Sequence, residues 1–124
     1  MDINPLIPKD RNIINSYGPE GFKINDKLYK NSLIITPNHI LEIKINSLEE
    51  FFGYDFKKIF DVDPEILLVG TGEHHKIISP VLKNKIKDIY PLISIDEMTT
   101  ASACRTYNIL MMEDRNVAAF LIMV

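Results

Sequence analysis

The segment Pro64-Glu65-Ile66-Leu67-Leu68-Val69-Gly70-Thr71-Gly72 decides the fold class of this chain. Its centre is a short, continuous apolar run that begins after a proline and ends at a glycine. A run of this length and composition is typical of a strand that is buried on both faces. Strands of this kind occur in sheets that are covered on both sides, so the segment predicts an α/β domain.

The residues after this strand alternate between helical and strand patterns. Ser79 and Pro80 suit the N-cap and the first position of a helix, and apolar residues then recur at helical spacing: Val81, Leu82, Ile86 and Ile89. Residues 92–95 predict a further buried strand, residues 99–112 a helix, and residues 117–123 a last strand. From residue 65 onward the expected order is therefore β-α-β-α-β.

The residues before the decisive segment indicate antiparallel strands. Residues 22–24 and 28–29 flank Asn25-Asp26-Lys27, a combination that favours a β-hairpin with an Asn/Asp turn. Strands at 32–36 and 40–45 follow, and the second of them alternates apolar and polar residues. Together they predict an N-terminal antiparallel meander.

A capping box at Ser47-Leu48-Glu49-Glu50 then starts a helical stretch that runs to about residue 60, with Gly53 dividing it into two short pieces. Residues 1–16 are expected to form an extended N-terminal arm. The predicted fold is a single α/β domain over residues 1–124. Its N-terminal meander is followed by β-α-β-α-β, and helices flank a central mixed sheet in three layers.

Composition excludes several function classes. A net charge of −3 argues against a dedicated nucleic-acid binder, which usually carries a basic surplus on one face. The lone Cys104 cannot form an internal disulfide, and residues 1–10 resemble neither a secretory signal nor a transit peptide. The longest apolar stretch, residues 117–124, is too short for a membrane-spanning helix. We therefore expect a cytoplasmic protein with no membrane span.

The first candidate binding residues are Gly70, Thr71 and Gly72, which follow the buried strand directly. In open α/β sheets ligands bind at the carboxyl ends of strands, and glycines there allow the backbone to approach a ligand closely. The segment is not a phosphate loop, because the lysine-containing pattern is missing. A tight turn that needs glycine torsions is the alternative explanation.

The helix expected at 99–112 supplies the second group of candidates. One stripe of it is apolar and indicates core: Thr100, Ala103, Cys104, Tyr107, Leu110 and Met111. On the neighbouring stripe, Arg105 either pairs with a carboxylate of the chain or receives an anion or a partner's carboxylate. Asn108 either ties down a loop carbonyl or belongs to the same site.

No catalytic, metal or cofactor site emerges from these patterns. Cys104 lies on the apolar stripe, whereas a nucleophilic thiol needs a partly exposed, electropositive setting. His74 and His75 are adjacent and lack a third, suitably spaced ligand for a metal. We therefore expect a binding or assembly protein and not an enzyme.

Three segments together resemble one family. They are Tyr17-Gly18-Pro19-Glu20-Gly21-Phe22-Lys23-Ile24-Asn25, Pro64 to Gly72 as quoted above, and Ala103-Cys104-Arg105-Thr106-Tyr107-Asn108-Ile109-Leu110. The family resembled contains the mitochondrial respiratory complex I assembly factor 3 and many small prokaryotic proteins of unassigned function. The similarity runs from about residue 13 to the end of the chain.

The resemblance implies a compact α/β domain with a mixed sheet, no established catalysis, and an assembly role with protein partners. Those partners are respiratory complex I subunits or another assembly factor. Carried over by motif, the binding positions are Gly70, Thr71, Gly72, Arg105, Tyr107 and Asn108. The chain departs from the family's usual pattern at Glu20, Asp26, Thr99 and Ala101, which argues against a tight anion pocket at the start of the last helix.

Three functions follow as hypotheses. The first is a non-enzymatic assembly factor for complex I or another membrane-associated complex. The second is a small-molecule or anion-binding domain, conceivably an unrecognised enzyme, whose site lies where Gly70–Gly72 meets Arg105. The third is a structural homo-oligomer that pairs through the exposed edge of the meander.

Overall fold

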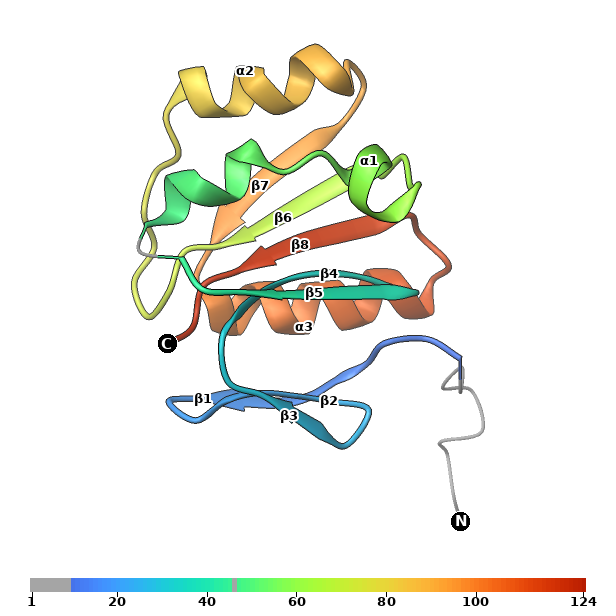
Figure 1. The fold of residues 1–124 in the computed structure, drawn as a ribbon, viewed down its shortest axis with the longest axis vertical. Coiled ribbons are helices and arrows are strands. Elements are labelled where there is room, and N and C mark those ends of the chain that lie inside the picture. The colour runs from blue at the N-terminus through green and yellow to red at the C-terminus, as the bar shows by residue number, and fades with distance from the viewer. Residues whose placement is uncertain (1–9, 46) are drawn as a thin grey trace.

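The computed structural model describes residues 10–45 and 47–124, which form two β-sheets and the helices that pack on them (Figure 1). The larger sheet has five strands in the order β5-β4-β8-β6-β7. Their bounds are His39–Ile43, Ser32–Thr36, Val117–Leu121, Ile66–Gly70 and Ser94–Met98. Strand β6 runs parallel to β7 and β8, whereas β4 is antiparallel to β5 and β8. The predicted central mixed sheet is therefore confirmed.

The central strand β8 and its neighbour β6 are buried on both faces. Leu68 belongs to the core on one side of the sheet, and Leu67 and Val69 belong to the core on the other. Every residue of β8 is buried. The apolar run that predicted a doubly covered strand thus lies at the centre of the sheet, where both faces need apolar side chains.

One face of the large sheet is covered by helical segments that surround Phe120. They are the 3-10 helix η2 (Leu48–Gly53), the short helix α1 (Phe56–Phe60) and the longer helix α2 (Pro80–Ile89). Phe120 of β8 stacks on Phe51 at 4.8 Å and on Phe56 at 5.4 Å between ring centroids. The expected division of this helical stretch at Gly53 is confirmed.

The opposite face is covered by helix α3 (Thr100–Met112) and by the second sheet. That sheet has the order β1-β2-β3, with strands Ile14–Gly18, Gly21–Ile24 and Lys27–Tyr29. Asn25 and Asp26 have positive φ angles of 49° and 67°, which are the torsions of a two-residue hairpin turn. The predicted hairpin is confirmed, with Lys27 already in the strand. The three layers are therefore α3 with the small sheet, the large sheet, and the remaining helices (Figure 1).

The N-terminal predictions need two corrections. Residues 1–9 of the expected arm lie outside the described residues, but Ile14–Ser16 belong to β1, because Ile14 and Ser16 pair with Ile24 and Lys23 of β2. The meander is also divided between the sheets. Strands β1 to β3 form the small sheet, whereas β4 and β5 join the large one, since β4 pairs with β8.

Two predictions in the C-terminal half are corrected as well. The strand expected at residues 92–95 begins at Ser94 and is an edge strand, with Leu92 97% exposed in the turn before it. In α2 only Ile86 is fully buried, while Val81 and Ile89 are exposed. Apolar spacing showed that these elements exist, but it could not show which residues face the core.

We expect Phe120→Ala to lower the free energy of unfolding by about 3–5 kcal/mol, because the ring is fully buried among the aromatic residues of η2 and α1. Equilibrium denaturation with urea measures this loss. Ile109→Ala is the control, since Ile109 is 59% exposed on α3 and its truncation should change stability by no more than about 0.5 kcal/mol. Equal effects of the two substitutions would contradict the assigned core.

Candidate functional site

Gly70-Thr71-Gly72 forms the turn between β6 and the loop that follows it. A Cβ atom at Gly70 would lie 2.9 Å from the Cα of Thr100, so only glycine lets the end of β6 approach the start of α3 this closely. Gly72 has a φ of +109°, a torsion that other residues rarely adopt. Both glycines thus have a structural reason to be there.

The polar groups of this turn are bonded within the chain. The Thr71 N–H donates to the Met98 carbonyl at 2.8 Å, and the Gly72 N–H donates to Thr100 Oγ1 at 2.9 Å. The Thr71 hydroxyl donates to the His74 carbonyl at 2.8 Å. These groups cannot bind an anion without giving up the bonds that hold the turn. The tight-turn explanation therefore accounts for Gly70 and Thr71.

Tyr107 and Asn108 attach the N-terminal segment to α3. The buried Tyr107 hydroxyl donates to the Asn12 carbonyl at 2.8 Å, and burial raises the pKa of this phenol. The Asn108 side chain donates to the Ile14 carbonyl at 2.8 Å and accepts from the Ile14 N–H at 2.9 Å. Asn108 thus takes the place of a neighbouring strand for Ile14, the first residue of β1. Of the two alternatives for Asn108, these bonds favour the tie to backbone groups, although the partner is a strand residue and not a loop.

Arg105 differs from the other arginines of the chain. Arg11 pairs with Asp114, and Arg115 pairs with Glu65. Among the described residues Arg105 has no carboxylate partner, and its Nη1 donates instead to the Tyr17 hydroxyl at 2.8 Å. The first of the two alternatives for Arg105, a pair with a carboxylate of the chain, is therefore not found among the described residues. The Arg105 Nη2 lies 3.5 Å from the Ser102 hydroxyl, a long bond, and Arg105 is exposed, so part of its planar set of donors stays available.

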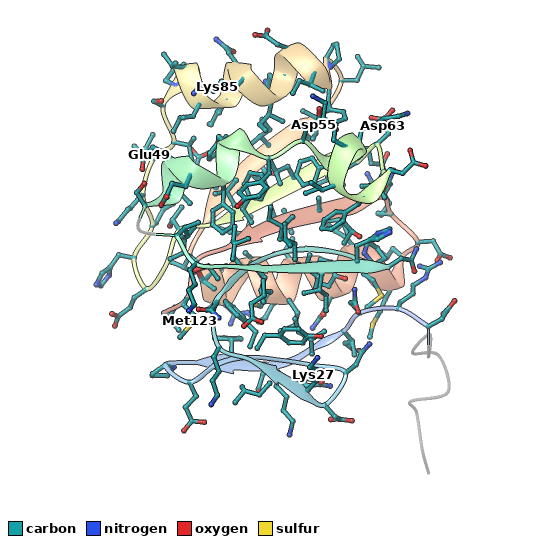
Figure 2. All side chains as sticks on the ribbon, in the orientation of Figure 1. Lys27, Glu49, Asp55, Asp63, Lys85 and Met123 are labelled. Atoms are coloured by element: carbon teal, nitrogen blue, oxygen red, sulfur yellow. The ribbon has the colours of Figure 1, made fainter. Side chains whose placement is uncertain are left out.

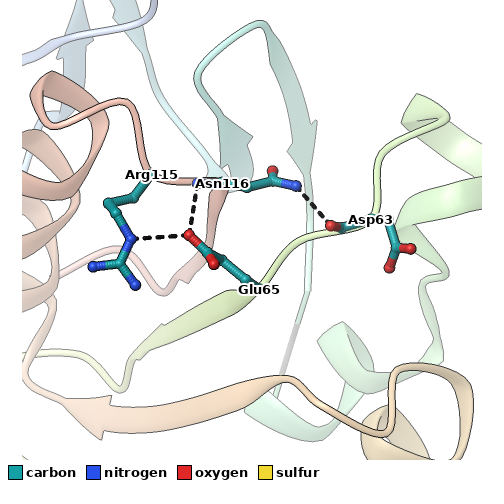
Figure 3. Close-up of polar contacts among 4 residues, drawn as sticks. All are labelled: Asp63, Glu65, Arg115 and Asn116. Atoms are coloured by element: carbon teal, nitrogen blue, oxygen red, sulfur yellow. Dashed lines mark hydrogen bonds and ion pairs between the residues drawn. The ribbon is translucent and has the colours of Figure 1, made fainter.

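Arg115, in contrast to Arg105, has a structural role, because it forms an ion pair with Glu65 (Figure 3). Its Nε donates to Glu65 Oε1 at 2.9 Å, and this bond holds the pKa of the Glu65 carboxyl below its usual value. The Asn116 side chain donates to the Asp63 carbonyl at 2.6 Å. These contacts join the turn before β8 to the segment that enters β6. Arg115 is thus committed to the fold.

A shallow pocket of about 340 Å³ lies beside the Arg105–Tyr17 contact. Its lining comes from the end of β1 and the turn after it, the Gly72 loop, the first turn of α3 and the last residue: Tyr17, Gly18, Pro19, Gly72, Glu73, Ala101 and Val124. Ala101 and Arg105 are four residues apart and therefore neighbours on one face of α3. We call these lining residues together with Arg105 the Tyr17 pocket.

The Tyr17 pocket gathers only some of the predicted site residues. Gly72 lines it and Arg105 bonds to its lining residue Tyr17, whereas Tyr107 and Asn108 bond to the N-terminal segment and Gly70 is packed against α3. The sequence prediction missed Tyr17 as a site residue. The signal was present, since Tyr17 opens the first of the three segments that carry the family resemblance.

Cys104 is buried, and its thiol is a poor nucleophile. Burial raises its pKa to about 12, and the opposing effect of the Arg105 charge is smaller. In the part of the chain that the structure describes, no three His, Cys, Asp or Glu side chains come together as a metal site. None of the helices within residues 10–45 and 47–124 is long and apolar enough to cross a bilayer.

Comparison with known proteins places the chain in a family. Residues 14–122 match the family described as protein of unknown function (DUF498/DUF598). The chain belongs to this family. The match covers all the described strands and helices from β1 to β8, so both sheets belong to the shared domain.

Three relatives show the range of the family. A 13 kDa major membrane protein of Francisella tularensis is 33% identical over 103 residues, 82% of either chain. The NADH dehydrogenase (ubiquinone) 1 alpha subcomplex assembly factor 3 of Danio rerio is 29% identical over 112 residues, 89% of this chain and 63% of the relative. The crystal structure of an outer membrane protein from Bartonella henselae superposes with a TM-score of 0.74 at 30% identity and covers 94% of this chain and 98% of that one. The chain thus spans about three-fifths of the assembly factor it matches.

Asn108→Ala should reduce the free energy of unfolding by roughly 2–4 kcal/mol, because it leaves the N–H and the carbonyl of Ile14 without partners. Arg105→Ala should change it by no more than about 0.5 kcal/mol, since the lost bond is exposed. Urea denaturation of both variants tests the two roles. A large loss for Arg105→Ala would assign this residue to the fold.

Cys104 should resist alkylation by iodoacetamide in the folded protein at about pH 8, because only the thiolate reacts and burial keeps the thiol protonated. In denaturant the same thiol should react completely. Mass spectrometry after timed quenching measures the difference. Rapid modification of the folded chain would show that Cys104 is accessible and ionised, and would reopen a nucleophilic role.

Proposed function

We propose that this protein is a non-enzymatic, protein-binding assembly factor for respiratory complex I or another membrane-associated complex. The observation that carries the proposal is the match to complex I assembly factor 3, which extends over 89% of this chain for the Danio rerio protein and 88% for the human one. The family domain of this chain spans β1 to β8, so the proposal assigns partner binding to this domain.

The relatives from bacteria support the wider form of the proposal. The Francisella and Bartonella proteins are both named membrane proteins. An assembly factor for a membrane-associated complex works next to a bilayer, and it needs no span of its own to do so. These names are the support for including other membrane-associated complexes in the proposal.

We assign the partner contact to the Tyr17 pocket. Interface hot spots are rich in tyrosine and arginine, and they lie where an apolar side chain fills a depression. Tyr17 and Arg105 supply the first feature, and the depression between Pro19, Gly72 and Ala101 supplies the second. Arg105 also forms no ion pair with a carboxylate among the described residues, whereas Arg11 and Arg115 do. It is therefore the arginine best placed to bind a carboxylate of a partner.

The proposal excludes catalysis by this domain. Support comes from Cys104, whose thiol is buried and has its pKa raised to about 12. Further support comes from Thr71 and Thr100, whose hydroxyl groups are bonded to backbone atoms on both sides of the β6 turn. A surface that binds protein needs none of these groups to react.

A small-molecule site is the second candidate, and the Tyr17 pocket is the observation that favours it. A volume of about 340 Å³ is at the lower end of ligand pockets. A ligand there would place an apolar group over Gly72 and Ala101 and an anionic group at Arg105. The turn around Thr71 has no free hydrogen-bond donor for such a ligand at Thr71 N–H or Gly72 N–H, since both groups are already bonded within the chain.

The test is native affinity purification of the tagged chain from its own cells, grown under conditions in which they make complex I. Quantitative mass spectrometry then identifies the proteins retained. We expect enrichment of complex I subunits. Arg105→Ala should reduce this enrichment by about thirtyfold if Arg105 contributes the 2 kcal/mol of a hot spot. Lys58→Ala is the matched control and should leave the enrichment unchanged, because Lys58 is exposed on α1, which packs on the face of the large sheet opposite α3.

Tyr17→Phe separates two roles of Arg105, because it removes the hydroxyl that holds the guanidinium and leaves the charge in place. Partial retention of the partner in this variant would show that the charge itself binds. If no complex I subunit is enriched and deletion of the gene leaves the complex intact, the assembly proposal is wrong. A partner-free protein that carries a small molecule would favour the second candidate.

A further inference from the structure

Exposed aliphatic side chains gather on α2 and the two segments beside it. Leu92 is 97% exposed, Ile77 84% and Val81 69%, the highest values among the large hydrophobic residues that the structure describes. Ile89 adds a fourth exposed side chain, on the same helix as Val81. Single exposed apolar residues are ordinary, but a group of them on one helix and the segments that flank it marks an interaction surface.

These residues lie at one end of the molecule. Helix α2 lies across the end of the long axis opposite the small sheet (Figure 1), and Figure 2 places Lys85 at this end and Lys27 at the other. Val81, Lys85 and Ile89 are spaced by four and so share one face of the helix, while Ile86 is buried beneath. We call Ile77, Val81, Lys85, Ile89 and Leu92 the α2 surface. A helix that lies across the end of a molecule can meet a flat surface along its whole length.

The charge around the α2 surface is opposite in sign to that of the whole chain. Residues 76–92 contain lysines at positions 76, 83, 85 and 87 and a single carboxylate, Asp88, whereas the chain carries a net charge of −3. Lys83 pairs with Glu97 of β7 at 2.9 Å. Lys76, Lys85 and Lys87 have no ion-pair partner among the described residues and therefore remain available to an outside anion.

We propose that the α2 surface docks on an anionic lipid surface. Bulky aliphatic side chains with lysines between them are the composition of helices that lie in the plane of a bilayer interface. The aliphatic groups enter the headgroup region, and the lysine stems extend so that their ammonium groups reach the phosphates. A protein interface fits less well, because lysine is depleted from the centre of such interfaces. This inference does not depend on which complex the protein assembles.

The docking is peripheral and reversible. Helix α2 has ten residues, and only its outer face is free, since Ile86 and Leu82 pack toward the sheet. Binding should therefore need both the aliphatic contacts and the lysine charges. It should weaken as salt screens the attraction between the lysines and the lipid phosphates.

The experiment measures sedimentation of the purified full chain with vesicles of phosphatidylcholine and phosphatidylglycerol at about three to one, at low salt. Vesicles of phosphatidylcholine alone serve for comparison. We expect binding to the anionic vesicles only. Each lysine charge removed by Lys85→Gln or Lys87→Gln should weaken binding by about fivefold, and Asp88→Asn should strengthen it by about the same factor.

The contribution of the exposed aliphatic side chains to vesicle binding is tested with Val81→Asp and Leu92→Asp. Both positions are exposed, so the fold should tolerate the change. Each should abolish detectable sedimentation. Ile109→Asp is the matched control, because Ile109 is 59% exposed on α3, away from the α2 surface. It should bind vesicles as the unaltered chain does, which shows that a new carboxylate elsewhere does not prevent binding.

Two results would overturn the inference. One is that the unaltered chain does not sediment with anionic vesicles. The other is that Val81→Asp and Leu92→Asp bind as well as Ile109→Asp. If vesicles are not bound but Leu92→Asp removes complex I subunits in the purification described above, the α2 surface is a protein interface. In that case the lipid inference fails while the assembly proposal stands.

Discussion

Thr100 joins the ends of the two central strands to the start of α3, and the rest of the structure depends on this contact. Its hydroxyl accepts the Gly72 N–H at 2.9 Å and donates to the Ile122 carbonyl at 2.7 Å, while its own N–H donates to the Gly72 carbonyl at 2.9 Å. The side chain is fully buried. Gly70 makes the contact possible, because any side chain there would collide with the first turn of the helix.

The fixed start of α3 determines what the rest of that helix can reach. Tyr107 and Asn108 follow two turns later and hold residues 12–14 in place, which positions β1 and with it the small sheet. Because β1 is held in this way, its far end brings Tyr17 against Arg105. The Tyr17 pocket is therefore a consequence of how α3 is anchored at its first turn.

The proposed function and the further inference use two separate surfaces. The Tyr17 pocket lies between the small sheet, the Gly72 loop and α3, whereas the α2 surface lies at the opposite end of the long axis from the small sheet (Figure 1). A protein with this arrangement can contact a lipid surface at one end and a protein partner away from it. Neither contact requires a reactive side chain, in keeping with the bonded hydroxyl groups and the buried thiol of this domain.

The sequence by itself determined most elements of the fold and their order, with β1 as the exception. Apolar runs, helix caps and the Asn-Asp turn are local signals, and they correctly indicated β6, the hairpin of β2 and β3, and α2 and α3. The tertiary structure decided which strands pair, that β7 lies at an edge, and that Val81 and Leu92 face outward, since these properties depend on residues distant in the chain. It also decided the site. The motif residues Thr71, Tyr107 and Asn108 are engaged in internal hydrogen bonds, while Arg105 bonds to Tyr17, 88 positions away, and not to a carboxylate among the described residues. Spacing along a chain cannot show such a contact, because only the packing of β1 on α3 creates it.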